Sequence, residues 1–160
     1  MSPRLAPAAL AAACCLLAGC GDSGPAAARC TPPPTASPAV ATAGPLSART
    51  DRGALAAGDT VKVSLDVAGP ATYSAPCDGP VQIVVVDSAD LHVGTASAPA
   101  PKGTPCGGVN LAAGQTAHYE VLWTSDDTLP PGRYSLAASL GDQPAISLTV
   151  TIGAGPFTTC

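Results

Sequence analysis

An alternation of apolar and polar side chains, repeated in several segments, is the feature that most limits what this chain can fold into. The first such segment places Val61, Val63, Leu65 and Val67 between the polar residues Lys62, Ser64 and Asp66. The same period of two returns in residues 116–123, 132–140 and 146–152. A period of two puts alternate side chains on opposite faces of a β-strand, with one face buried. These segments are therefore predicted to be half-buried strands.

The segments between these strands complete an all-β pattern. Residues 81–86 are nearly all apolar, which predicts a central strand covered on both faces. A polar turn at residues 87–90 leads into a shorter strand at residues 91–96, and no helical pattern follows residue 20. Short strands separated by Gly- and Pro-rich turns predict an antiparallel β-sandwich of about seven strands.

Two aromatic residues are expected to have structural roles in this sandwich. Trp123 shares its face of the strand with Tyr119, which predicts that it belongs to the core and is not a platform for sugar stacking. The segment Pro130-Pro131-Gly132-Arg133-Tyr134 is typical of a tyrosine corner, in which a tyrosine near the start of a strand bonds back to the main chain.

The first 20 residues have the three parts of an export signal. Arg4 supplies a positive charge, residues 5–17 are apolar apart from Pro7, and small residues follow. This stretch is shorter than the roughly 20 apolar residues that span a membrane. Its end, Leu17-Ala18-Gly19-Cys20, resembles the lipobox of bacterial lipoproteins. The resemblance implies that residues 1–19 are removed and that Cys20 carries a diacylglyceryl thioether and becomes the acylated N-terminus. That places two or three acyl chains such as palmitate on one residue, enough for stable anchoring.

Residues 20–48 are predicted to form a tether, and residues 49–160 the sandwich domain. The tether consists mainly of Gly, Ala, Ser, Thr and Pro and includes the polyproline II segment Thr31-Pro32-Pro33-Pro34. Within it, Gly21-Asp22-Ser23-Gly24-Pro25 looks like the nucleophile motif of chymotrypsin-like proteases. That motif requires a histidine and an aspartate upstream in a folded barrel, and here only the signal precedes it, so we assign it no catalytic role.

Residues 111–134 resemble part of a known family. Leu111-x-x-Gly114, Trp123 and Leu129-Pro130-Pro131-Gly132-x-Tyr134 are similar to the C-terminal half of the BsuPI-type intracellular proteinase inhibitor domain. The resemblance covers roughly residues 58–152 and is specific at about 111–140. It implies an immunoglobulin-like β-sandwich, a domain type that also occurs in exported bacterial lipoproteins. This chain differs from the namesake in its export signal and its cysteines, and no inhibitory residues are carried over.

The cysteine pattern predicts two disulfides. Of seven cysteines, Cys14 and Cys15 lie in the signal and Cys20 is the lipid site. The remaining four are Cys30, Cys77, Cys106 and Cys160. An even number outside the cytoplasm predicts pairing, with three possible connectivities. We favour Cys77–Cys106, which flank the central strand pair, and Cys30–Cys160, which flank the domain where chain ends often meet.

Charge and side-chain chemistry exclude several functions. The chain has 7 Lys and Arg against 11 Asp and Glu, so it lacks the basic stripe that nucleic acid requires. The negative net charge also gives no attraction to anionic lipid, so the lipid on Cys20 alone must hold the protein at the membrane. The only histidines, His92 and His118, lie on different predicted strands without ligands at metal spacing. Asp126 and Asp127 lack the further oxygen ligands of a Ca²⁺ site. We therefore expect no cofactor, no metal and no catalytic residues.

The expected function is that of a non-enzymatic binding or accessory module. Cys20 would anchor it to the cell membrane on the extracytoplasmic side, where its partner is an unidentified cell-envelope or extracellular protein. Residues 70–80 and 97–110 are the candidate recognition loops, because they are rich in Pro and Gly and bounded by cysteines. The alternative is a protease inhibitor, motivated by the BsuPI resemblance, that uses residues 98–105 as a rigid substrate mimic. An enzyme is the weakest of the three hypotheses.

Overall fold

The computed structural model describes residues 36–153, which form eleven β-strands and no helix. The strands are β1 (Val40–Ala43), β2 (Leu46–Thr50), β3 (Ala54–Ala56), β4 (Thr60–Ala68), β5 (Ala71–Ala75), β6 (Val81–Val86), β7 (His92–Ala98), β8 (Gly107–Leu111), β9 (Thr116–Thr124), β10 (Gly132–Leu140) and β11 (Ile146–Gly153). Within this part of the chain no helix offers an apolar span of membrane length.

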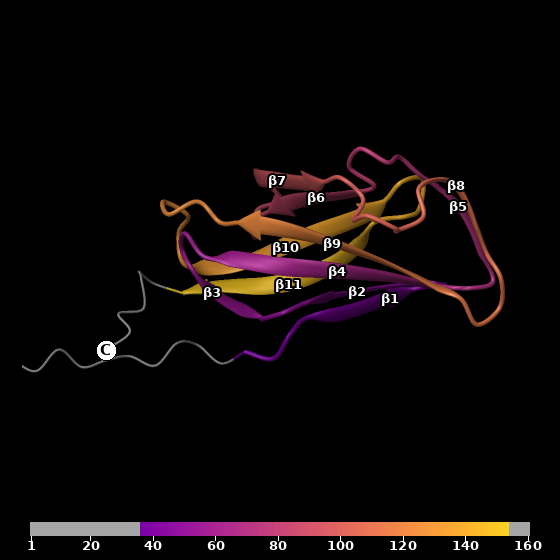
Figure 1. Cartoon of the computed structure of the whole chain (residues 1–160). Coiled ribbons are helices and arrows are strands. Elements are labelled where there is room, and N and C mark those ends of the chain that lie inside the picture. The colour runs from indigo at the N-terminus through magenta and orange to yellow at the C-terminus, as the bar shows by residue number, and fades with distance from the viewer. Residues whose placement is uncertain (1–35, 154–160) are drawn as a thin grey trace, which may run out of the picture.

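Two sheets pack against each other, and a two-stranded ribbon lies toward one end (Figure 1). Sheet A has the order β1-β2-β4-β9, and sheet B has the order β3-β11-β10-β6-β7. The ribbon consists of β5 and β8. Neighbouring strands are antiparallel except for β3 and β11, which run parallel. The predicted all-β class and antiparallel sheets are confirmed, and the layering is consistent with a β-sandwich.

The strands predicted from alternation are present, with the predicted faces buried between the sheets. Sheet A contributes the buried side chains Val61, Val63, Leu65, Val67, Ala117, Tyr119, Val121 and Trp123. Sheet B contributes Tyr134, Leu136, Ala138, Leu140, Ile146, Leu148, Val150 and Ile152. Removing these apolar surfaces from water is the main favourable contribution to folding. Trp123 is thus a core residue, as its place in the alternation predicts.

The structure has more strands than the roughly seven predicted, because several short strands carry little periodicity. β1, β3, β5 and β8 have only three to five residues each, mostly Ala, Gly, Ser and Thr. β1 and the beginning of β2 also lie inside the segment 20–48 that was predicted to be a tether. Leu46 and Ala48 of β2 are buried against the core, so the folded part begins earlier than residue 49.

The prediction that β6 is covered on both faces is wrong. β6 lies in sheet B between β10 and β7, with its side chains alternately buried and exposed. Val84 is 39% exposed on the outer face, and Gln82 is exposed beside it. The apolar run arose because valine, a good strand former, occupies outward positions as well as inward ones.

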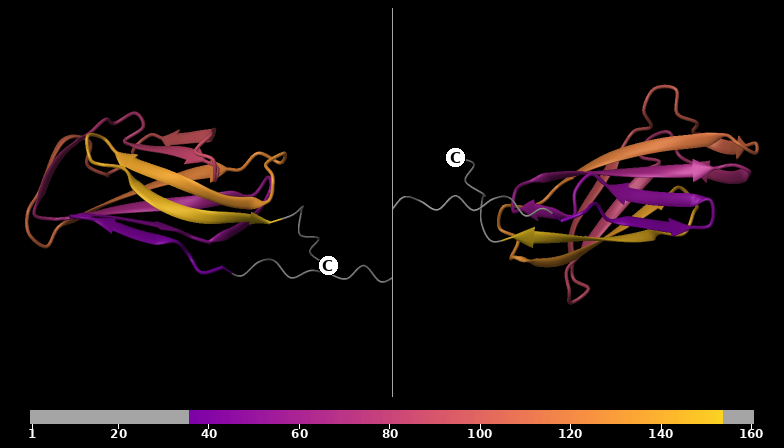
Figure 2. Two further views of the ribbon diagram at one scale, coloured as in Figure 1. Left: turned by 180° about the vertical axis from the view of Figure 1, so that it is seen from behind. Right: turned by 90° about the horizontal axis from the view of Figure 1, so that it is seen from below.

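Both ends of the described chain lie at the end of the sandwich opposite the ribbon (Figures 1 and 2). The amide of Gly53 donates a hydrogen bond of 3.3 Å to the carbonyl of Ala36, near the first described residue. The carbonyl of Gly53 in turn accepts a bond of 2.9 Å from Thr151 in β11. The chain therefore enters and leaves the sandwich side by side, with the ribbon at the far end.

Candidate functional site

The two segments predicted as recognition loops, residues 70–80 and 97–110, come together in the ribbon. β5 and β8 pair from Ala71 with Leu111 to Ala75 with Gly107. Sequence reasoning treats both segments as loops, because Ala, Gly and Pro dominate them and hide the short strands. The structure therefore unites them as one hydrogen-bonded element.

The ribbon is closed by a disulfide between Cys77 and Cys106, as the favoured pairing predicts. Cys77 follows β5, Cys106 directly precedes β8, and their Cα atoms lie 5.0 Å apart. The amide of Ala100 also donates a hydrogen bond of 3.0 Å to the carbonyl of Cys77. Cys20, Cys30 and Cys160 lie outside the described residues, so lipidation and the second disulfide stay predictions.

Two buried tyrosines attach this end to sheet A. The ring of Tyr73 in β5 meets that of Tyr119 in β9 edge to face, with centroids 6.4 Å apart. Their hydroxyl oxygens lie 2.8 Å apart, and the Tyr119 hydroxyl donates a bond of 2.7 Å to the carbonyl of Pro105. Burial, aided by the hydrogen bond with Tyr73, raises the pKa of Tyr119, so this hydroxyl stays protonated and able to donate. The loop before β8 is thereby fixed against β9.

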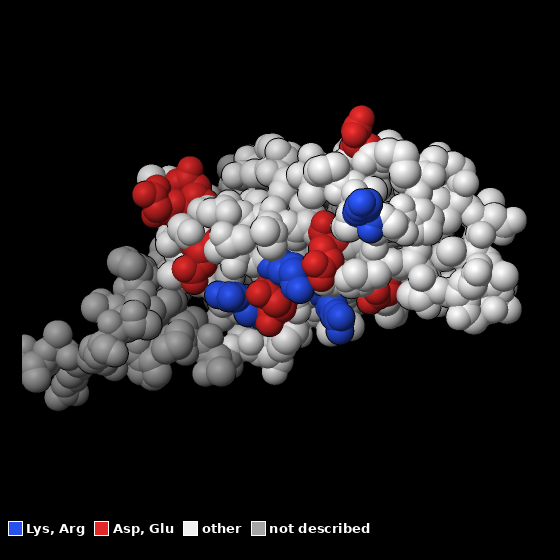
Figure 3. Space-filling model, in the orientation of Figure 1, with Lys and Arg blue, Asp and Glu red and all other residues white. Residues whose placement is uncertain are grey.

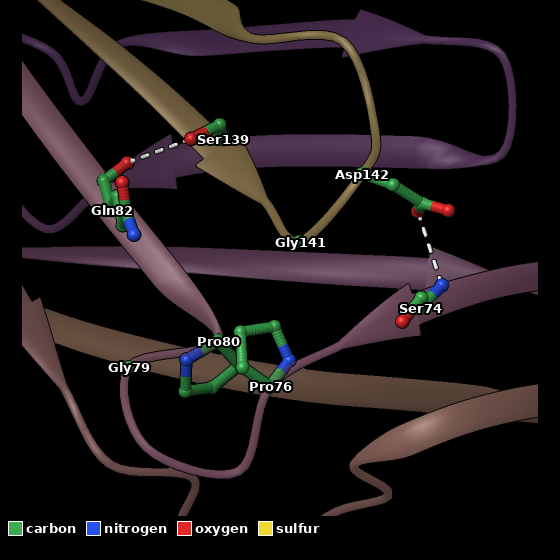
Figure 4. A pocket seen from close by; sticks show the side chains of 8 residues that line it. All are labelled: Ser74, Pro76, Gly79, Pro80, Gln82, Ser139, Gly141 and Asp142. Atoms are coloured by element: carbon green, nitrogen blue, oxygen red, sulfur yellow. Dashed lines mark hydrogen bonds between the residues drawn. The ribbon is translucent and has the colours of Figure 1, made fainter.

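The outer edge of β5 is occupied by the turn between β10 and β11 (Figure 4). The carboxylate of Asp142 accepts a hydrogen bond of 3.0 Å from the amide of Ser74, which lowers the pKa of Asp142. The amide of Asp142 donates a bond of 3.1 Å back to the carbonyl of Ser74. A hollow of about 320 Å³ lies here, lined by Ser74, Pro76, Gly79, Pro80, Gln82, Ser139, Gly141 and Asp142. Asp142 thus satisfies the main chain of β5 where a neighbouring strand would otherwise bind.

The edge of β8 faces a larger hollow of about 620 Å³ on the other side of the ribbon. Its lining residues are Gly103, Pro105, Cys106, Gly108, Val109, Asn110, Leu111, Gln115 and Thr116. The hollow therefore lies between β8 and the beginning of β9, which follow one another in sequence but belong to different sheets.

A network of ion pairs lies on the outer face of sheet A, where charged side chains gather (Figure 3). His118 Nδ1 lies 2.6 Å from the carboxylate of Asp66, and its Nε2 lies 3.1 Å from that of Glu120. Lys62 Nζ lies 3.0 Å from the same Glu120 oxygen. The hydrogen bond with Asp66, followed by that with Glu120, raises the pKa of His118. The hydrogen bond with Lys62, followed by that with His118, lowers the pKa of Glu120.

The sequence could not reveal this network in full. Asp66 and His118 are 52 residues apart and meet only through the register of β4 and β9. His118 is a strand histidine, as predicted, but its pairing with Asp66 was not predicted. The two carboxylates contact opposite nitrogens of the imidazole instead of converging on one point. Among residues 36–153, no cluster of three His, Cys, Asp or Glu side chains is arranged to hold a metal ion.

Tyr134 and Trp123 have structural positions away from the ribbon. The hydroxyl of Tyr134 donates a hydrogen bond of 2.6 Å to the carbonyl of Pro130, which is the contact expected of a tyrosine corner. Trp123 packs against Gly94 of β7, where an added Cβ would lie 3.1 Å from the indole nitrogen. Asp126 accepts a bond of 2.8 Å from the amide of Thr128, so this aspartate stabilises its turn.

Comparison with known proteins adds no family. No protein-family model matches the chain, and no curated protein matches its sequence. One solved structure with similarity is an alkylpurine DNA glycosylase, AlkC, of Pseudomonas fluorescens, bound to DNA containing an abasic site analog. It has a TM-score of 0.42 and 18% sequence identity, and the match covers 66% of this chain and 29% of the glycosylase. The chain thus spans less than a third of that enzyme, and a likeness of this degree defines neither a shared fold family nor a shared function.

Proposed function

We propose that this protein is a membrane-anchored lipoprotein on the extracytoplasmic side whose immunoglobulin-like β-sandwich is a non-enzymatic binding or accessory module. The observation that carries the proposal is that the chain enters the sandwich at one end and the ribbon lies at the other. The described chain begins next to Gly53, while the disulfide-closed ribbon lies at the opposite end. A lipid on Cys20 would therefore leave the ribbon pointing away from the membrane, where it can meet a partner.

Dimensions support this arrangement. A strand of nine residues such as β9 is about 30 Å long at roughly 3.4 Å per residue. The ribbon is thus displaced from the point of chain entry by about the length of the sandwich. The segment between Cys20 and Ala36 adds a further spacer rich in Pro and Ala.

The immunoglobulin-like assignment rests on features typical of that class. The two-sheet layering, the buried Trp123 and the hydrogen bond of Tyr134 to Pro130 all recur in immunoglobulin-like sandwiches. The ribbon β5–β8 is an addition to the two main sheets, and it is the part that carries the disulfide. Function in such folds lies in sites added to a common scaffold, which directs attention to the ribbon.

The anchor is tested by fractionating cells that express the full-length chain or its Cys20→Ala variant. The native chain should be in the membrane fraction and incorporate labelled palmitate, whereas C20A should do neither. Cys14→Ala, which removes a cysteine of the signal, is the matched control and should behave as the native chain. Membrane attachment of C20A would refute the anchor.

Protease inhibition is the second candidate, and the geometry of residues 98–105 favours it. Lys102 is exposed at a turn in which the amide of Thr104 donates a hydrogen bond of 3.0 Å to the carbonyl of Pro101. The disulfide at Cys106 restrains the end of this loop, which lowers the entropy lost when a protease binds it. The mature C20A chain should then inhibit a trypsin-like secreted protease, and Lys102→Ala should abolish the effect. Absence of inhibition at micromolar concentration across a panel of secreted proteases would exclude this candidate.

A further inference from the structure

The sheet edges of this protein are protected unequally. The edge of β5 is bound by Asp142 through both main-chain groups of Ser74. The first half of β9 is covered by the loop before β8. Pro105 accepts a hydrogen bond from Tyr119, and Thr104 Oγ1 lies 3.4 Å from the carbonyl of His118. The edge strands β1 and β3 have four and three residues. Natural sheets limit unwanted pairing by short or covered edges of this kind.

The edge strand β7 is shielded in another way. It stands beside β9 at the side of the sandwich, where Gly94 packs against the ring of Trp123. Its pairing with β6 also contains an irregularity between Val85 and Val86, which distorts the edge.

β8 is also short, with five residues, but no loop or side chain of the described residues binds its edge. Within the described residues, the main chain of Gly107–Leu111 makes hydrogen bonds only with β5. In an antiparallel pair, alternate residues of each strand direct their N–H and C=O groups away from the partner. Ser74 lies opposite Gly108 and directs its own amide and carbonyl outward to Asp142, so Gly108 and Asn110 are the two residues of β8 whose main-chain groups point away from β5. A further strand could supply the matching donors and acceptors for these two residues.

The space beside this edge can receive such a strand. The hollow of about 620 Å³ lies along β8, and two of its lining residues, Gly103 and Gly108, are glycines without a side chain to occupy it. A Cβ built on Gly107 or on Gly108 would meet no other atom within 4 Å. The glycines thus leave room for the main chain of another polypeptide to approach closely.

A charge next to a lining residue of the hollow indicates the chemistry of the occupant. Lys102 is exposed next to Gly103, and it is the only Lys, Arg, Asp or Glu residue between residues 91 and 117. No carboxylate of this segment competes for it, so a carboxylate of the ligand would have an attractive partner there.

We propose that the edge of β8 binds an extended peptide segment of another protein as a third strand of the ribbon, with a carboxylate of that segment near Lys102. This inference rests on the proposed binding function and specifies its partner class. Most of the affinity would come from main-chain hydrogen bonds, so the site would tolerate varied sequences but exclude proline at the positions whose amides bind β8.

Selected peptides test the mode of binding directly. Random octapeptides displayed on phage are selected on the full-length mature C20A chain, and the best are synthesised with a single N-methyl group at each amide in turn. N-methylation at alternate positions should weaken binding about tenfold or more, because it removes a donor and blocks the approach. The amides of β8 should gain protection from hydrogen exchange, and Lys102→Glu should weaken peptides that contain a carboxylate. Failure to enrich peptides, effects without alternation, or protection elsewhere would each overturn the proposal.

Photo-crosslinking in cells separates this inference from the proposed function. A benzoylphenylalanine is placed at Asn110, exposed on β8, or at Thr149, exposed on the outer face of sheet B. Crosslinks to an extended segment of a partner from Asn110 and none from Thr149 are expected. A partner crosslinked only at Thr149 would overturn the β8 site and retain the binding function. If neither position, nor any of a wider set of surface positions, crosslinks a protein, both the β8 site and the binding function are contradicted.

Discussion

The hydroxyl of Tyr119 in β9 donates a hydrogen bond of 2.7 Å to the carbonyl of Pro105, the residue before the disulfide-bonded Cys106. The hydroxyl of Tyr73 in β5 lies 2.8 Å from the same Tyr119 oxygen. A residue of sheet A, a residue of the ribbon and the loop before β8 therefore meet at one polar point. This point sits against the core, so each of its groups depends on the others for a hydrogen-bond partner.

Tyr119→Phe should destabilise the protein by about 1–3 kcal/mol, because it leaves the Tyr73 hydroxyl without this partner at a buried site. It also releases the carbonyl of Pro105, so the amides of residues 104–106 should exchange faster. The free energy of unfolding is measured with urea, and exchange by mass spectrometry. Tyr73→Phe is the control: it keeps the bond to Pro105 and should leave exchange in the loop nearly unchanged. Equal effects of the two variants on the loop would contradict this assignment.

Replacing both Cys77 and Cys106 by serine should lower the free energy of unfolding by about 3–4 kcal/mol. The disulfide closes a chain segment with a sequence separation of 29, and its loss restores conformational freedom to the unfolded chain. Urea denaturation of the double variant and of the native chain, both without reductant, is the measurement. Unchanged stability would mean that strain in the folded state offsets the constraint.

Gly141→Ala should be strongly destabilising, whereas Gly114→Ala should have a smaller effect. Both glycines have positive φ, 52° and 83°, which costs an alanine about 1–3 kcal/mol. At Gly141 a Cβ would also overlap the carbonyl of Ser74, while at Gly114 it would meet no other atom within 4 Å. The difference in Tm between the two variants, measured by thermal unfolding, separates the cost of the clash with Ser74 from the cost of positive φ. Equal losses of Tm would show that the turn at Gly141 moves away from β5 at little cost.

The ion-pair network on sheet A predicts that stability depends on pH. The hydrogen bond with Asp66 is the main cause that raises the pKa of His118 above its ordinary value of 6.5. The contribution of His118 to stability is therefore complete below pH 6.5 and disappears as the pH rises through the folded-state pKa. The pKa of Glu120 is lowered below 4.5, mainly by Lys62, so its contribution is present above 4.5 and disappears as pH falls through the folded-state value. The network should therefore stabilise the fold most between pH 4.5 and 6.5.

Comparison with a His118→Gln variant measures this effect. Because the side chains are partly exposed, the difference between the two proteins should stay below about 1 kcal/mol. The native chain should lose stability relative to the variant as the pH rises above 6.5 in urea titrations. The imidazole signals of His118 should titrate above pH 6.5 in NMR spectra, and Asp66→Asn should lower that value. An unchanged titration in D66N would contradict the assigned cause.

Periodicity made the long strands predictable, because each buries one face in the core. Val61, Tyr119 and Leu136 point inward as their alternation requires. The same criterion fails for Val84, because a valine on the solvent face is indistinguishable in sequence from one in the core. It also fails for β5 and β8, since small side chains give no signal of which face is buried.

The candidate site was predictable only in its parts. Cys77 and Cys106 mark its boundaries in the sequence, and they are bonded in the structure. The contacts of Asp142 with Ser74 and of His118 with Asp66 depend on which strands become neighbours and in what register. Register is set by the packing of the whole sandwich, so it cannot be read from either residue's local sequence.

The side-by-side entry and exit of the chain, with the ribbon at the far end, has a mechanical consequence. A pull between a lipid on Cys20 and a partner on β8 would run along the strands. The hydrogen bonds between β1 and β2 would then be loaded together in shear, as would those between β2 and β4, and would not open one at a time. Such a module would resist tension best along the line that joins its membrane to its partner.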